Sequence, residues 1–147
     1  MDAISKVAQL IGRVALGSIF LVSGFGKLTG WSGTVAYASS KGVSTALLAI
    51  ATALELLGAV SILLGLKARW GAVALLIFLV PVTLVFHNFW AAPAQQQQLE
   101  LANFLKNLGI AGGLLIVFGR GAGAFSIDAR RSPDAAFDVA GQGSRAV

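Results

Sequence analysis

One short stretch at the end of an apolar segment carries the side chains best suited to chemistry. It reads Val85-Phe86-His87-Asn88-Phe89-Trp90 and holds the only histidine of the chain. An imidazole exchanges protons near neutral pH, and an amide can donate a hydrogen bond to a carbonyl oxygen. A tryptophan next to an apolar segment is typical of a membrane–water interface. His87 and Asn88 could therefore bind a small polar group just inside hydrocarbon, and His87 could exchange a proton with it.

Other apolar segments bring polar groups that could meet this stretch. Lys27 ends the first segment, and Asn103, Lys106 and Asn107 lie at helical i, i+3 and i+4 spacing on the last one. We predict an outer-half cofactor site for a carbonyl or carboxylate group, formed by His87, Asn88, Asn103, Asn107 and Lys27. The alternative is that these residues are only wetted by lipid headgroups, with Lys27 extending its ammonium to the interface.

Glu55 and Lys106 are the candidates for proton transfer. Counting along their segments places Glu55 roughly 14 Å and Lys106 roughly 10 Å below the outer interface. A carboxylate this deep must be paired, protonated or in contact with water. We predict a Glu55–Lys106 ion pair and assign both residues a catalytic role; the alternative is that the pair only fixes helix packing.

Two further residues interrupt the apolar segments. Arg13 lies in the inner half of the first, where it either extends toward lipid phosphates or forms a second partner for Glu55. Pro81 lies in the middle of the third and removes the backbone hydrogen bond to Ile77. A kink there would open space beneath His87.

Composition restricts the chemistry that this chain can perform. The 147 residues are 56% hydrophobic and 12% charged, and this balance indicates a membrane protein. Cysteine is absent, which excludes thiolate, iron–sulfur and disulfide chemistry. A single histidine cannot supply both axial ligands of a bis-histidine haem. One histidine and one buried carboxylate are also too few ligands for a metal site. His87 has no acidic partner at its expected depth, so a nucleophilic triad is not predicted. The net charge is +5, but the basic residues are not interleaved with aromatic residues in the pattern that would indicate nucleic-acid binding.

Four segments must position these groups. Residues 7–28, 46–66, 70–90 and 99–118 each have about the twenty apolar residues that span ~30 Å of hydrocarbon as a helix. The fold class predicted is therefore all-α, a four-transmembrane-helix bundle, with a short amphipathic helix at residues 34–40 of the first outer loop. The tight link around residue 68 predicts that the second and third helices are antiparallel neighbours.

Charge asymmetry predicts the orientation. Seven lysines and arginines lie on the side of both termini and two on the opposite side, so both termini should be cytoplasmic. We divide the chain into a membrane domain, residues 1–128, and a disordered cytoplasmic tail, residues 129–147. Residues 125–128 are expected to fold back against the inner surface.

Four runs occur in order along the chain: Gly24-Phe25-Gly26-Lys27-Leu28, Glu55-Leu56-Leu57-Gly58, Phe86-His87-Asn88-Phe89-Trp90 and Asn103-Phe104-Leu105-Lys106-Asn107-Leu108. Through these runs the chain resembles the DoxX family of small bacterial membrane proteins. It implies a multi-pass four-helix domain in the bacterial cytoplasmic (inner) membrane. It also implies an association with oxidoreductases, quinone-linked respiration or oxidative-stress complexes.

The leading functional hypothesis is a membrane oxidoreductase component that binds a quinone-like lipophilic cofactor. Electrons would come from a protein partner, because the chain has no cysteine and no second haem ligand. The alternatives are a carrier for a small metabolite and a non-catalytic assembly or scaffold subunit. Beyond membrane lipid, a second copy of the chain is a candidate partner, since Gly109 with Gly113 and Ser61 with Gly65 form small-xxx-small steps.

Overall fold

The computed structural model describes residues 3–131, and in this part of the chain all regular structure is helical. The elements, in order, are α1 (Ala3–Thr29), α2 (Trp31–Ser40), α3 (Thr45–Leu64), α4 (Ala68–Phe86), the 3₁₀ helix η1 (Phe89–Ala91), α5 (Ala94–Arg120) and α6 (Ile127–Arg131). Four of them, α1, α3, α4 and α5, are long and apolar enough to cross a membrane. The predicted fold class is confirmed.

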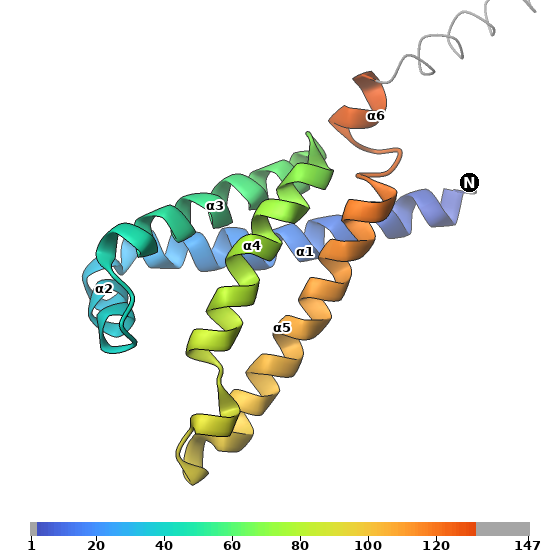
Figure 1. Cartoon of the computed structure of the whole chain (residues 1–147). Helices are drawn as coiled ribbons and strands as arrows, with labels where there is room; N and C mark the ends of the chain where they lie inside the picture. The colour runs from blue at the N-terminus through green and yellow to red at the C-terminus, as the bar shows by residue number, and fades with distance from the viewer. Residues whose placement is uncertain (1–2, 132–147) are drawn as a thin grey trace, which may run out of the picture.

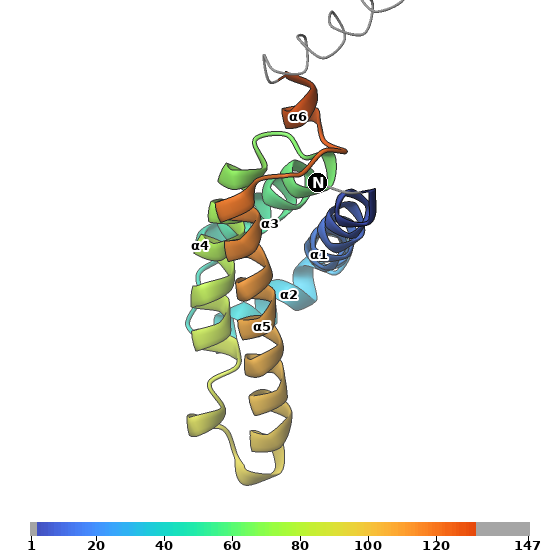
Figure 2. The same ribbon diagram turned by 90° about the vertical axis from the view of Figure 1, so that its right-hand side faces the viewer.

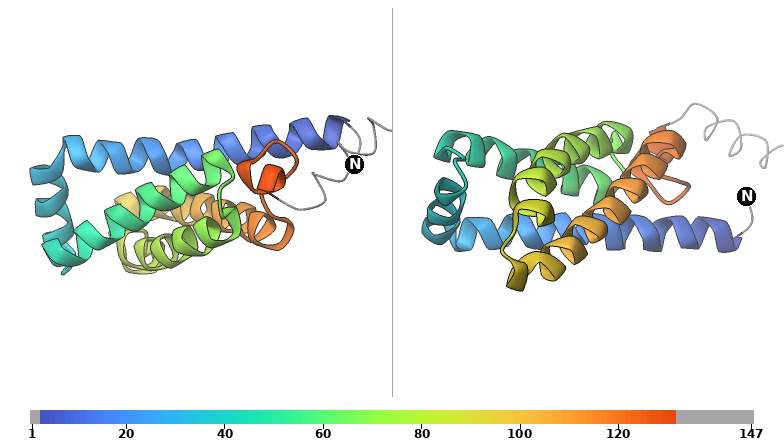
Figure 3. Two further views of the ribbon diagram at one scale, coloured as in Figure 1. Left: turned by 90° about the horizontal axis from the view of Figure 1, so that it is seen from above. Right: turned by 60° about the horizontal axis from the view of Figure 1, so that its bottom comes forward.

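The four long helices form two antiparallel hairpins (Figure 1). One consists of α1 and α3 with α2 in their connection, and the other of α4 and α5 with η1 in theirs. The hairpins pack through α3 and α4 and spread apart toward α2 and η1 (Figures 1 and 2). Figure 3 shows the beginning of α1 at the same end as the α3–α4 turn and α6. We refer to the end where the hairpins diverge, which carries α2 and η1, as the open end.

The ends of the helices differ from those expected at two places. The third segment was expected to stay helical to residue 90, but α4 ends at Phe86. The chain then turns back onto α5, where the rings of Phe89 and Trp90 pack 5.4 and 5.9 Å from the ring of Phe104. The helix α5 begins at Ala94, before the expected start at residue 99, so the four glutamines at 95–98 form its first turns. His87 and Asn88 therefore lie in a break between helices.

Glycines permit the close helix contacts. A Cβ added to Gly24 of α1 would lie 2.6 Å from Leu56 of α3, and one added to Gly58 of α3 would lie 2.6 Å from Leu75 of α4. By contrast, a Cβ added to Gly109, half of a predicted small-xxx-small step, would meet nothing within 4 Å. Glycines thus permit the close approach of α1 to α3 and of α3 to α4, while the Gly109 face stays open within the described chain.

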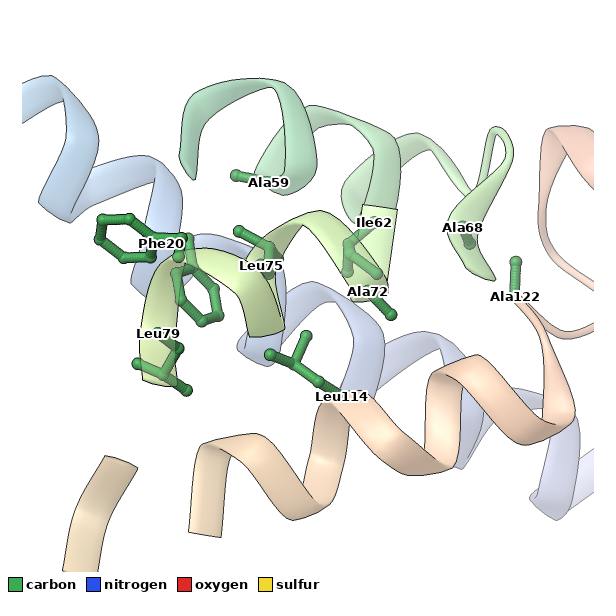
Figure 4. Close-up of a cluster of buried hydrophobic side chains, with 10 residues drawn as sticks. Phe20, Ala59, Ile62, Ala68, Ala72, Leu75, Leu79, Leu114 and Ala122 are labelled. Atoms are coloured by element: carbon green, nitrogen blue, oxygen red, sulfur yellow. The ribbon is translucent and has the colours of Figure 1, made fainter. Parts of the chain in front are cut away.

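The apolar core lies where the two hairpins cross (Figure 4). Ile62 of α3, Leu75 of α4 and Leu114 of α5 are fully buried, and the rings of Phe20 and Phe78 meet edge to face at 6.2 Å. Most other large apolar side chains on the four long helices point outward. A chain that exposes this much apolar surface is suited to hydrocarbon, not water.

The short helix of the first loop is confirmed, with bounds Trp31–Ser40 in place of residues 34–40. Its residue Ala38 is buried, and the ring of Tyr37 lies 5.4 Å from that of Phe86 at the end of α4. Helix α2 therefore connects the two hairpins at their open end.

The segment after α5 closes the other end, as predicted. The Asp128 carboxylate accepts hydrogen bonds from the backbone N–H of Lys67 (2.7 Å) and of Ala68 (3.0 Å), and the Asp128 N–H donates to the Gly65 carbonyl at 2.9 Å. Asp128 thus caps α4 from outside its own helix. The expected tail begins at residue 129, but residues 129–131 belong to α6; its remainder, 132–147, lies outside the described residues.

Arg13 does not take either of its expected roles. Its side chain is buried, and its two terminal nitrogens donate hydrogen bonds to the carbonyls of Ala122 and Phe125. Neither lipid phosphate nor Glu55 is its partner in the described chain. The segment that follows α5 crosses Arg13 and presents two backbone acceptors, which a sequence pattern does not reveal.

We predict that Asp128→Ala will lower the free energy of unfolding by about 1 kcal/mol, the usual cost of a lost helix cap. Hydrogen exchange should become faster at the amides of Lys67 and Ala68, and it can be measured by mass spectrometry in detergent. Asp128→Asn keeps one carbonyl acceptor and should have a smaller effect. Equal protection in all three proteins would show that the cap does not stabilise the turn.

Candidate functional site

A cavity of about 680 Å³ lies between the two hairpins at their open end. Its lining comes from α1 to α5 and is mostly apolar. Five of the seven predicted site residues lie on its walls: Lys27, Glu55, His87, Lys106 and Asn107. The structure thus brings most of the predicted polar groups to one space, although not in the predicted pairs.

Glu55 and Lys27 form the central polar contact of the cavity. The Lys27 ammonium donates to both Glu55 carboxylate oxygens, at 3.0 and 2.9 Å, and to the Ser23 hydroxyl at 2.6 Å. The Glu55 side chain is only 1% exposed, whereas that of Lys27 is 23% exposed. The ammonium also lies 5.4 Å from the centre of the Phe78 ring, within the range of a cation–π contact. A buried carboxylate is therefore held against the cavity by a partly accessible cation.

The predicted Glu55–Lys106 pair is wrong. Lys106 donates instead to Asn103 of its own helix at 3.1 Å. Gly24 lets α3 approach α1 so closely that a Cβ there would lie 3.4 Å from a Glu55 oxygen. Lys27, one turn beyond Gly24, then extends inward to the carboxylate, whereas Lys106 lies across the cavity on the other hairpin. The interpretation of Lys27 as an interfacial lysine is also wrong for this reason.

His87 has an acidic partner that sequence reasoning missed. Its Nδ1 lies 2.8 Å from the Glu100 carboxylate, near the start of α5. Glu100 lies at the start of the fourth segment predicted from the sequence, residues 99–118, but was not expected to pair with His87. The tight Pro93 turn was the available signal, since it makes the start of α5 the antiparallel neighbour of the end of α4. A hydrogen bond at Nδ1 fixes the ring, whose other nitrogen remains for a ligand.

The three amides differ in their surroundings. Asn107 is buried and donates to the Thr83 hydroxyl at 3.0 Å, while its backbone neighbour Lys106 stays exposed. Asn88 precedes η1, and Asn103 accepts from Lys106. Neither Asn88 nor Asn103 lines the cavity. Of the predicted amides, only Asn107 is placed to contact a ligand there.

Some apolar residues of the cavity wall are also exposed at the surface of the protein. Leu47 and Ile50 of α3 and Ile77 of α4 line it, and each is more than half exposed. Pro81 also lines it from the same part of α4, where sequence reasoning expected space beneath His87. A ligand that reaches the cavity between α3 and α4 would pass apolar side chains, which favours a lipophilic molecule.

No group of three or more histidine, aspartate or glutamate residues gathers within residues 3–131 in the manner of a metal site. The cavity offers instead two ammonium groups, an imidazole, an amide and a carboxylate. These groups can donate to a carbonyl oxygen and accept a proton.

Comparison with known proteins identifies the family. The DoxX family profile matches residues 8–88, more than half of the chain. The chain belongs to the DoxX family. Two similar relatives come from Escherichia coli (strain K12). The inner membrane protein YphA is 35% identical over 87% of this chain and 93% of its own length. The inner membrane protein YqjF is 33% identical over 87% of this chain and 95% of its own length.

A more distant similarity covers part of this DoxX-family protein. The Surfeit locus protein 4 homolog of Schizosaccharomyces pombe is 29% identical over 48% of this chain and 24% of its own length. No solved structure shows a significant match. The two Escherichia coli relatives are inner membrane proteins, and together with the four apolar helices they support a multi-pass membrane protein.

Proposed function

We propose that this DoxX-family protein binds a quinone-like lipophilic ligand in the cavity and works as a component of a membrane oxidoreductase or oxidative-stress system. One observation carries the proposal: a mostly apolar cavity of about 680 Å³ with the Lys27–Glu55 ion pair on its wall. Pockets for small organic ligands usually measure roughly 300–1,000 Å³ and are apolar with a few placed polar groups.

The residues of the cavity fit a ligand with an apolar body and carbonyl oxygens. Lys27 can donate to one such oxygen, since its side chain is the accessible partner of the ion pair. His87 can donate or accept through its free ring nitrogen, held in place by Glu100. Glu55 is the acceptor for a proton, and Lys106 and Asn107 contribute donors from the opposite wall. A bound quinone would supply two-electron, two-proton chemistry.

Electrons would have to come from a partner protein. The chain contains no cysteine and a single histidine, so it lacks the usual ligands of an iron–sulfur cluster or a doubly ligated haem. We place the protein in the bacterial inner membrane with both termini cytoplasmic. The support is that the basic residues of the α3–α4 turn, the end of α5 and α6 gather at one end.

The carrier hypothesis receives less support. Transport needs access from both sides of the membrane, yet no residue of the segment 121–131 lines the cavity. At that end Arg13 and Asp128 hold the chain against α1 and the α3–α4 turn. A scaffold function would use the ion pair for packing alone and predicts no ligand.

The test is to purify the protein in mild detergent, extract it with organic solvent and quantify quinone per polypeptide. We expect near-stoichiometric quinone in the parent protein and loss of at least about ten-fold in Glu55→Gln and His87→Ala, the size expected when a buried polar contact is lost. Circular dichroism establishes that each variant is folded.

Asn88→Ala is the matched control, because Asn88 is the direct neighbour of His87 but does not line the cavity. It should retain the parent's quinone content. Equal quinone in the parent and all three variants, or none above the bulk lipid level, would reject the proposal and favour the scaffold hypothesis.

A further inference from the structure

A second cavity lies at the opposite end of the molecule, outside the proposed quinone site. It measures about 410 Å³ and lies between the beginning of α4 and the segment that follows α5. Lys67, Arg69 and Trp70 line one side, and the backbone of residues 121–123 and Asp128 line the other. The proposed function uses none of these residues.

The charges around this cavity leave an excess of cations. The side chains of Lys67 and Arg69 are exposed and form no hydrogen bond or ion pair with another described residue. The carboxylate of Asp128 accepts from two backbone N–H groups of the turn. Arg13 is a third cation nearby. It does not line the cavity, but it donates hydrogen bonds to the carbonyl of Ala122, which does, and to that of Phe125. An anion in the cavity would therefore be attracted.

The backbone holds the two free cations in place. Lys67 has a φ of 49°, the left-handed conformation that a lysine rarely adopts, and Asp128 bonds to its N–H. Gly121, with a φ of 81°, brings its backbone so close that a Cβ there would lie 3.6 Å from the Arg69 Nε. A lysine ammonium supplies a point charge and an arginine guanidinium a planar fork of donors, a combination suited to phosphate oxygens.

The exposed indole of Trp70 indicates the level of this cavity in the membrane. Its side chain is 73% exposed at the beginning of α4, and tryptophans concentrate at headgroup depth. We propose that the cavity is a binding site for an anionic phosphate group, supplied by the headgroup of a phospholipid in the adjacent leaflet. The protein would thus hold an anionic lipid between the α3–α4 turn and the segment after α5.

The experiment uses Trp70 as the reporter. The chain has three tryptophans, so Trp31→Phe with Trp90→Phe leaves Trp70 alone. The full-length protein is placed in vesicles with brominated phosphatidylglycerol or brominated phosphatidylcholine, and quenching of the indole is measured at equal mole fractions. We expect stronger quenching by phosphatidylglycerol. In this background Lys67→Asn and Arg69→Gln should each weaken the apparent affinity about five-fold, the share of one cation at a membrane surface.

Asparagine is chosen for Lys67 because it tolerates the left-handed conformation. Lys41→Gln removes a cation at the opposite end and should leave the quenching unchanged. If millimolar inorganic phosphate reduced the quenching of Trp70 while the two lipids quenched it equally, the phosphate site would be supported but assigned to a soluble anion. Equal quenching by the two lipids with no effect of phosphate, or the same quenching after loss of both cations, would overturn the proposal.

Discussion

Lys27→Met should lower the free energy of unfolding by roughly 3–5 kcal/mol, the cost of removing one partner of a buried ion pair. The reason lies with Glu55, whose side chain is 1% exposed and would lose the one cationic partner that it has among residues 3–131. To remain there it must either keep an unpaired charge away from water or take up a proton. Unfolding in mixed micelles, followed by circular dichroism, measures the effect.

Two further variants make this test specific. Lys106→Met removes the lysine on the opposite wall, whose hydrogen bond goes to Asn103 of its own helix, and should change stability by no more than about 0.5 kcal/mol. The double variant Lys27→Met with Glu55→Gln replaces the ion pair by two neutral side chains and should recover most of the loss. If Lys106→Met cost as much as Lys27→Met, Lys106 and not Lys27 would be the cation that matters for Glu55.

The second large effect is expected at the other end of the molecule. Arg13→Leu removes two charge-assisted hydrogen bonds to the carbonyls of Ala122 and Phe125, each worth roughly 1.5–3 kcal/mol. The segment 121–131 should then leave its position, and limited proteolysis should cleave it many times faster than in the parent protein. Helices α1 to α5 are held by other contacts and should stay protected.

The conservative variant separates charge from geometry at this position. Arg13→Lys keeps the charge but has no planar fork, so it should restore only part of the protection. Arg120→Leu, at an exposed position at the end of α5, is the control and should be cleaved like the parent. Unchanged cleavage of Arg13→Leu would mean that the cap at Asp128 alone holds the segment.

These two contacts act at opposite ends of the same architecture. The Lys27–Glu55 pair lies where the hairpins diverge and a cavity opens, and Arg13 lies where they meet. The polar groups of the proposed quinone site are therefore confined to one end. The other end is fastened by hydrogen bonds to backbone carbonyls and amides.

Much of the fold was predictable because a membrane limits the choices. Backbone groups in hydrocarbon must be satisfied within the chain, so an apolar run of about twenty residues indicates a helix. The same reasoning located α2 through the interfacial residues of the first loop. It failed at the end of α4, because the packing of Phe89 and Trp90 on Phe104, not hydropathy, decides where that helix stops.

The sequence by itself determined that four helices cross a membrane and that polar side chains gather near one end of them. Only the tertiary structure decided the partners. Depth counted along each helix says nothing about which helices are neighbours, and here Gly24 lets α1 approach α3 and brings Lys27 to Glu55. The turn at Pro93 likewise brings Glu100 to His87. A side chain pairs with what the crossing of the helices brings near, and that crossing depends on packing surfaces from distant parts of the chain.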